Sequence, residues 1–113
     1  MDLYEEIEKL MKELTASIKA LRKNGTSLAE AERDYKITLR QEALRLRAGD
    51  MPVTLINNII YGIDEVAEKR FKRDVEQATY DANKEHINIT KLKLRLLEAQ
   101  LSREWGAAGK GDI

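Results

Sequence analysis

The stretch from Asp64 to Trp105 contains no glycine and no proline and is far longer than any other helix that the sequence predicts. Because the residues that break helices are absent from it, the stretch predicts one continuous helix. At about 1.5 Å per residue this helix is about 60 Å long, roughly twice the diameter of a compact domain of this size. No shorter helix of the same chain can cover it. We therefore expect it to bend, or to be covered in part by a second copy of the chain or by a partner.

The composition favours a single all-α domain. Apolar residues make up 42% of the chain and charged residues 35%, and there is one proline and no cysteine. The lack of cysteine favours a cytoplasmic setting, and no apolar run is long enough to predict a membrane span. The acidic, amphipathic N-terminus predicts no signal peptide. The equal numbers of basic and acidic residues, 20 each, give no general attraction to nucleic acid or membranes. We expect one helical domain over residues 1–105 and a disordered tail over 106–113.

The N-terminal half predicts a hairpin of two amphipathic helices. The first is expected over Leu3–Lys23, with Asp2 as its N-terminal cap and Asn24–Gly25 as its stop. Ser27 begins a second capping box, and the second helix is expected over Leu28–Gly49. The short link between them predicts antiparallel packing. Their apolar stripes cover each other only in part, so the hairpin needs a third surface.

A short apolar segment follows, bracketed by Pro52 and Gly62. Its β-branched residues are compatible with a strand, but the chain offers no second strand to pair with it. We interpret it as a helix with proline at its first position. It is apolar around most of its circumference, which is typical of a buried plug or an interface. The interface residues predicted here are Val53, Ile56, Ile59 and Ile60.

The long helix carries two apolar faces. One face has coiled-coil spacing and is interrupted by Glu85; it contains Phe71, Val75, Ala78, Ala82, Ile89, Leu92, Leu96 and Ala99. A neighbouring face contains Ile87, Leu94, Leu97, Leu101 and Trp105. The wide C-terminal half is expected to pack under the chain's own hairpin. The narrow N-terminal half is expected to meet another copy or a partner through Phe71, Val75, Ala78 and Ala82. Glu85 either sets the register of that contact or marks where the contact opens to solvent.

Catalytic and metal-binding patterns are weak. His86 is the only histidine, and metal sites need several converging ligands. Asp74, Asp81 and Glu85 have many cations nearby, which favours a solvated, salt-bridged face over paired catalytic carboxylates. The chain has neither a glycine-rich phosphate loop nor a nucleophile elbow. The sequence predicts a non-enzymatic protein without a metal or a cofactor.

Two groups of basic residues leave an alternative open. One lies along the second predicted helix and the other lies early in the long helix; together they are Arg33, Lys36, Arg40, Arg47, Lys69, Arg70, Lys72 and Arg73. Such groups can hold the phosphates of a nucleic acid or a nucleotide. Acidic residues are interleaved with the second group, and few aromatic residues lie beside it for base stacking. An ion-paired surface is therefore preferred over a phosphate site, and neither is excluded.

Four segments resemble small helical proteins encoded by phages and prophages of Gram-positive bacteria. They are Tyr35–Arg47, Met51–Ile56, Ile60–Gly62 and Leu101–Gly106. The resemblance covers roughly residues 30–106 and brings no catalytic motif. It implies a phage context, the host cytoplasm and a binding role.

These observations lead to one preferred function and two alternatives. We expect an all-α homo-oligomer, a helical hairpin and a short apolar helix packed on one long C-terminal helix, that binds an unknown protein partner and modulates host or phage machinery. The first alternative is a nucleic-acid-associated replication or recombination accessory that uses the basic residues. The second is an oligomeric sponge for a nucleotide ligand. No membrane partner is expected.

Overall fold

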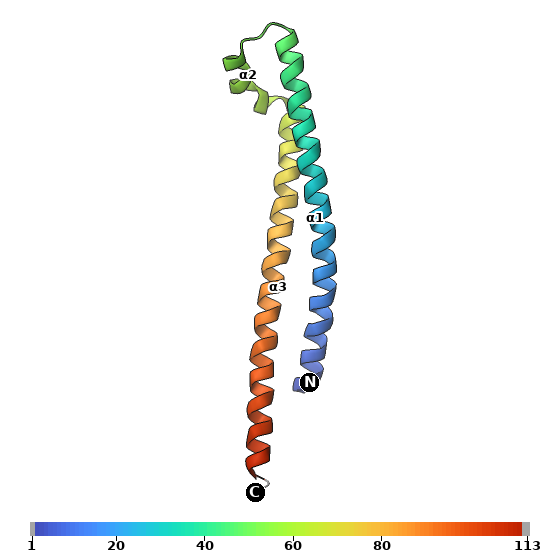
Figure 1. The fold of residues 1–113 in the computed structure, drawn as a ribbon, viewed down its shortest axis with the longest axis vertical. Coiled ribbons are helices and arrows are strands. Elements are labelled where there is room, and N and C mark those ends of the chain that lie inside the picture. The colour runs from blue at the N-terminus through green and yellow to red at the C-terminus, as the bar shows by residue number, and fades with distance from the viewer. Residues whose placement is uncertain (1, 112–113) are drawn as a thin grey trace. The chain divides into compact units, whose positions relative to one another are not determined.

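The computed structural model describes residues 2–111, and nearly all of them are helical. The elements in chain order are α1 (Leu3–Ala48), α2 (Val53–Ile59), the short 3-10 turn η1 (Ile60–Gly62) and α3 (Asp64–Gly111) (Figure 1). Residues 2–111 contain no strand, so the predicted all-α class is confirmed.

The predicted hairpin in the N-terminal half is wrong, because α1 is one helix of 46 residues that runs straight through Asn24–Ser27. Gly25 does not take the left-handed conformation that would stop a helix. A glycine inside a helix costs only about 1 kcal/mol, which packing can offset. The half-buried positions Leu21, Gly25 and Leu28 continue the inward-facing side of α1 through this segment. A continuous packed face thus overrides the local stop signal.

Both ends of α1 follow local chemistry. At the start, the Oδ1 atom of Asp2 accepts a 2.8 Å hydrogen bond from the backbone N–H of Glu5, which confirms the predicted cap. At the end, α1 stops at Ala48, next to the expected Gly49. The residue that takes the left-handed conformation is Asp50, with φ of 65°, rather than the glycine. Aspartate tolerates this region better than most residues, and the turn is completed there.

The apolar segment is helical, as predicted, in preference to a strand. Pro52 is the N-cap of α2 rather than its first residue, so the helix begins at Val53, one residue later than expected. The segment ends in η1, and Ile63 is extended before α3 begins at the predicted residue, Asp64.

At its other end α3 continues through Gly106 to Gly111, so the helix end expected at Trp105 is wrong. The sequence Gly106-Ala107-Ala108 contains two strong helix formers, and a single glycine costs too little to end a long helix. Residues 112 and 113 of the expected tail lie outside the described residues. The disorder predicted for residues 106–113 stays a prediction.

The chain divides into two compact units, and both long helices pass through both. Unit 1 comprises Met1–Arg22 and Ala82–Ile113, and unit 2 comprises Lys23–Asp81. The single domain expected over residues 1–105 stays a prediction, and each unit is described by itself.

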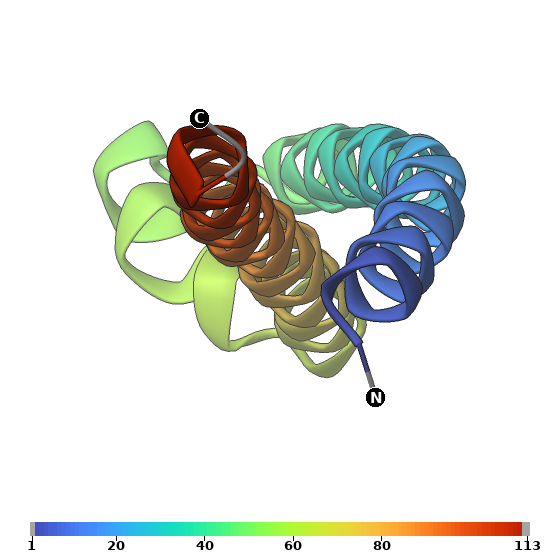
Figure 2. The same cartoon turned by 90° about the horizontal axis from the view of Figure 1, so that it is seen from below.

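In unit 2, α2 and η1 connect the end of α1 to the start of α3 (Figure 1), and they are the light-green coils in the end-on view (Figure 2). The core consists of Tyr35, Ile56, Ile60 and Val66, and Val66 is completely buried. Leu39, Ala43, Leu46, Met51 and Ile63 pack around it. α2 and η1 therefore fill this end of the unit with one isoleucine each, Ile56 and Ile60.

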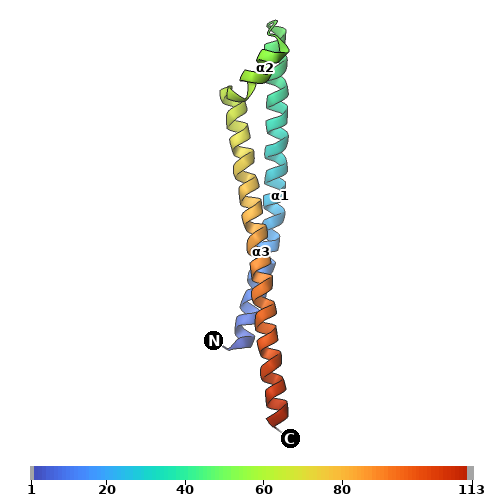
Figure 3. The same ribbon diagram turned by 90° about the vertical axis from the view of Figure 1, so that its left-hand side faces the viewer.

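In unit 1, the N-terminal part of α1 and the C-terminal part of α3 run side by side in opposite directions (Figures 1 and 3). The side-chain amide of Asn83 donates a 3.2 Å hydrogen bond to the carbonyl oxygen of Ser17 across this pair. Ile87, Thr90 and Leu94 follow Asn83 on the same face of α3 and are buried. The expected hairpin does not exist, so the α3 segment of this unit packs along one helix, α1, rather than under two.

Candidate binding surfaces

α3 has two faces with the same coiled-coil spacing, and only one of them packs within the chain. The inner face is the one that is buried or half-buried: Val66, Lys69, Arg73, Glu76 and Tyr80 in unit 2, and Asn83, Ile87, Thr90, Leu94, Leu97 and Leu101 in unit 1. Each residue of the coiled-coil stripe predicted from the sequence, from Phe71 to Ala99, lies two positions after a residue of this inner face. Two residues correspond to about 200° of rotation, so that stripe points away from the inner face. We call it the outer stripe.

All eight predicted residues of the outer stripe are exposed. In unit 2, Phe71 is 69% exposed and Val75 is 46% exposed, and Ala78 lies on the same side. In unit 1, Leu96 is 62% exposed, with Ile89 and Leu92 beside it. Three of the predicted interface residues, Phe71, Val75 and Ala78, thus line one open face of unit 2, and the fourth, Ala82, is exposed in unit 1.

The inner face of unit 2 is rich in polar residues, although it is the face that packs. Lys69, Arg73 and Glu76 are half-buried there. Long charged side chains can cover apolar surface with their aliphatic stems while their charged ends reach solvent or a partner. A search for apolar periodicity finds the outer stripe instead, and for that reason the inner face of unit 2 was missed.

The short apolar segment has both buried and exposed side chains. Of the four predicted interface residues, Ile56 and Ile60 lie in the core of unit 2, whereas Val53 and Ile59 are exposed. Two further residues of the segment, Leu55 and Tyr61, are exposed as well and were not singled out from the sequence. The segment is apolar over most of its length, so only the packed structure shows which of its side chains are buried. Val53, Leu55, Ile59 and Tyr61 are the α2 patch.

Arg73 is held in a polar cluster inside unit 2. Its guanidinium donates hydrogen bonds of 3.0 and 2.9 Å to the carboxylate of Asp74, and it lies 3.6 Å from the carboxylate of Glu32. The hydrogen bonds to Asp74 raise the pKa of Arg73 above its usual value, against the opposing effect of burial. The charge attraction of Glu32 adds to the increase. The guanidinium of Arg73 is therefore engaged in contacts within unit 2.

The other predicted phosphate-binding residues are mostly engaged within the chain as well. Arg33 pairs with Asp34 at 3.2 Å, and Lys36 lies 3.4 Å from Glu32. The guanidinium of Arg47 donates to the carbonyl oxygen of Met51. Arg70 lies over the ring of Tyr61, 5.2 Å from its centroid. Among the described residues, only Arg40, Lys69 and Lys72 of the eight have no such contact. Whether these residues also hold phosphates stays a prediction.

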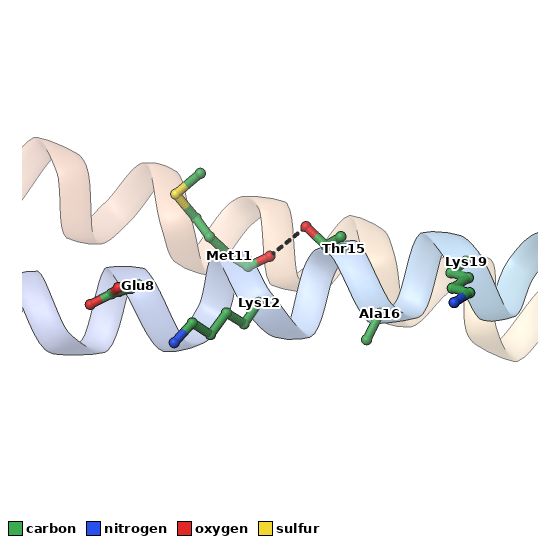
Figure 4. A pocket seen from close by; sticks show the side chains of 6 residues that line it. All are labelled: Glu8, Met11, Lys12, Thr15, Ala16 and Lys19. Atoms are coloured by element: carbon green, nitrogen blue, oxygen red, sulfur yellow. Dashed lines mark hydrogen bonds between the residues drawn. The ribbon is translucent and has the colours of Figure 1, made fainter.

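A shallow hollow of about 460 Å³ lies on α1 in unit 1. It is lined by Glu8, Met11, Lys12, Thr15, Ala16 and Lys19, which all belong to this one helix (Figure 4). The hydroxyl of Thr15 donates to the carbonyl oxygen of Met11, so it is satisfied by its own helix. Another open hollow, in unit 2, is lined by Gly25, Leu28, Ala29, Glu32, Gln77 and Tyr80. Neither hollow brings a nucleophile, a base and an oxyanion donor together.

His86 and Glu85 are both exposed on α3. Within residues 2–111, no group of three or more His, Cys, Asp or Glu side chains is arranged to hold a metal ion. The described helices also include none that is long and apolar enough to cross a membrane. Comparisons of the chain with protein-family models, with curated proteins and with solved structures gave no significant match in any of the three.

Proposed function

We propose that this protein is a non-enzymatic accessory protein of phage type that acts in the host cytoplasm by binding proteins, both a second copy of itself and a separate partner. The observation that carries the proposal is the amount of exposed apolar surface. Among the described residues, fifteen large hydrophobic side chains are at least 38% exposed, whereas only seven hydrophobic residues are buried. Nine of these fifteen belong to the α2 patch or the outer stripe, and exposed apolar residues that gather in this way typically mark a protein contact.

The arrangement of these side chains supports protein binding in particular. The outer stripe repeats at the three- and four-residue steps by which one helix packs on another, so it suits a second helix. The α2 patch adds four exposed apolar side chains on the short segment whose Ile56 and Ile60 belong to the core of unit 2. A nucleic acid would need a continuous row of available cations, and five of the eight candidate cations are already engaged.

Sedimentation velocity over a wide range of protein concentrations tests the self-association. The wild-type protein should form a defined oligomer whose population rises with concentration. Leu92→Glu should lower that population because it places a charge at an exposed apolar position of the outer stripe, whereas Arg40→Ala, which is on α1 and not on the stripe, should leave it unchanged. A monomer at every concentration would overturn the homo-oligomer.

Affinity capture from infected host cells tests the separate partner. Wild-type protein and the Val53→Asp variant are compared, since the substitution breaks the α2 patch at an exposed position. We expect a protein that the wild type retains and the variant loses. Binding to DNA at low salt that weakens steeply as salt rises would instead favour the nucleic-acid alternative.

A further inference from the structure

The C-terminal part of the outer stripe, within unit 1, has a symmetric pattern of charged and apolar residues. Glu85 lies four residues before its first large apolar residue, and Arg103 lies four residues after its last small one. Between these two charges the steps alternate between four and three residues without a break. We call this set the unit 1 stripe: Glu85, Ile89, Leu92, Leu96, Ala99 and Arg103.

We propose that the unit 1 stripe binds the same stripe of a second copy of the chain in antiparallel orientation, with Glu85 of each copy opposite Arg103 of the other. This inference rests on the self-association in the proposed function and adds the surface, the orientation and the register. The role of Glu85 is then to pair with Arg103 across the contact.

The stripe is available for such a contact. Ile89 is 44% exposed, Leu92 is 51% exposed and Leu96 is 62% exposed. The opposite face of the same helix segment, with Ile87 and Leu94, is already buried within unit 1. Since α3 packs on α1 through one face only, its other face is left as a row of apolar side chains without a neighbour.

Glu85 and Arg103 are suited to pair with each other because neither has an ion-pair partner among the described residues of its own chain. Both are exposed, and within residues 2–111 neither takes part in an ion pair. A charge at a seam position is costly when a contact buries it alone and is tolerated when an opposite charge faces it. In the antiparallel arrangement an ion pair between Glu85 of one copy and Arg103 of the other lies at each end of the apolar contact.

The register follows from the spacing. The two central leucines, Leu92 and Leu96, face each other across the twofold axis, and Ile89 of one copy meets Ala99 of the other. A large residue thus lies opposite a small one at each outer layer, which suits close packing of two helices. The contact is isologous, the usual form for a dimer of identical chains.

A parallel arrangement fits the charges less well. It would place Glu85 opposite Glu85 and Arg103 opposite Arg103, both inside the seam. The antiparallel arrangement has its own cost, because it brings Lys93 near Lys93 and Arg95 near Arg95 of the other copy. These four side chains lie at the exposed rim, where like charges cost much less than they do inside a seam. The balance therefore favours the antiparallel pair.

Cysteine cross-linking tests the orientation directly, because the chain has no cysteine of its own. One sample carries Ile89→Cys, a second carries Ala99→Cys, and a third is an equal mixture of both chains. Under mild oxidation we expect a disulfide-linked dimer in the mixture and little in either sample alone. Lys91→Cys, an exposed position beside the stripe, mixed with Ala99→Cys serves as the matched control and should not cross-link. A parallel contact would instead cross-link each single variant with itself, which would overturn the proposed orientation.

A charge reversal tests the pair of end residues. Glu85→Arg and Arg103→Glu should each weaken dimerisation by about tenfold or more, and the double variant should recover most of the loss. Both positions are exposed, so circular dichroism should show the same helix content in all variants. Additive losses in the double variant would overturn the pairing.

The outcomes separate this inference from the one it rests on. A wild-type protein that stays monomeric at all concentrations would remove both. An oligomer that forms normally but gives no cross-link through the unit 1 stripe would leave the self-association in place and overturn this surface. A third outcome is a variant in the unit 1 stripe that still forms the oligomer but no longer retains the captured partner protein. It would show that a different protein occupies the stripe, and it would also overturn the inference.

Discussion

The guanidinium group of Arg73 in α3 lies over the aromatic ring of Tyr35 in α1, with its central carbon 4.7 Å from the ring centroid. Tyr35 is a buried core residue of unit 2, and Arg73 lies on the inner face of α3. The same guanidinium reaches the carboxylates of Asp74 and Glu32. A residue that the sequence suggested as a phosphate ligand therefore joins two helices of one unit.

The contact between Tyr35 and Arg73 should contribute measurably to stability. Replacing Tyr35 with leucine removes the ring under the cation and leaves a gap in the core. We expect the free energy of unfolding in urea to fall by about 1–3 kcal/mol. Tyr35→Phe keeps the ring and is the matched control, with an expected loss below about 1 kcal/mol. Equal losses in the two variants would show that the ring does not interact with Arg73.

Leu94 and Leu96 offer a direct comparison of the two faces of α3. Leu94 is 8% exposed on the inner face, whereas Leu96 is on the outer stripe. Leu94→Ala should lower the free energy of unfolding by about 2–4 kcal/mol, because it leaves a cavity. Leu96→Ala should cost below about 1 kcal/mol when measured at a concentration where the protein is monomeric. Urea titrations of both variants check this, and a larger loss for Leu96→Ala would reverse the assignment of the faces.

Gly25 should accept an alanine. It lies inside α1, and an added Cβ atom would sit 3.5 Å from the Cε2 atom of Tyr80, an ordinary van der Waals distance. Because alanine favours helix over glycine, Gly25→Ala should stabilise the protein by about 0.5–1 kcal/mol, seen as a higher melting temperature. If the helix instead ended at Asn24–Gly25 with Gly25 in the left-handed conformation, Gly25→Ala would destabilise the protein, because alanine is strained in that conformation. The reverse change at an exposed site of the same helix, Ala29→Gly, should destabilise by a similar amount.

The amide of Asn83 should hold the two helices of unit 1 in register. It donates a 3.2 Å hydrogen bond to the carbonyl oxygen of Ser17, and the pair is partly buried. Asn83→Ala should lower the free energy of unfolding by about 1 kcal/mol, the usual net value of one such bond. Asn88→Ala, at an exposed position of the same helix, is the control and should change stability by less than about 0.5 kcal/mol. Thermal unfolding of the two variants under identical conditions provides the comparison.

Local signals identified most of the secondary structure correctly. The all-α class, the helical form of the Val53–Ile59 segment, the Asp2 cap and the start of α3 at Asp64 follow from residue types close together in sequence. Periodicity also located the outer stripe. Each of these depends on interactions within a few turns of the chain, and such interactions are visible in the residue order.

The main error arose where distant packing opposes a local preference. Asn24–Gly25 is a good helix stop by itself, yet α1 passes through it because the same face packs on both sides of the glycine. The misplaced end of α3 has a local cause instead, because Gly106 is exposed and is followed by two helix-forming alanines. A glycine inside a helix costs about 1 kcal/mol, and a continuous helix can gain more than this from the packing and hydrogen bonds of its other residues.

The sequence by itself determined that this protein is built from long amphipathic helices, and that the last of them carries two apolar faces. Only the tertiary structure decided which face packs within the chain. The inner and outer faces of α3 share the same spacing, so periodicity cannot distinguish them. The choice depends on which side chains find partners on α1, such as Arg73 with Tyr35 and Asn83 with Ser17. Those contacts join residues 38 and 66 positions apart, and for that reason the order of residues along one helix does not reveal them.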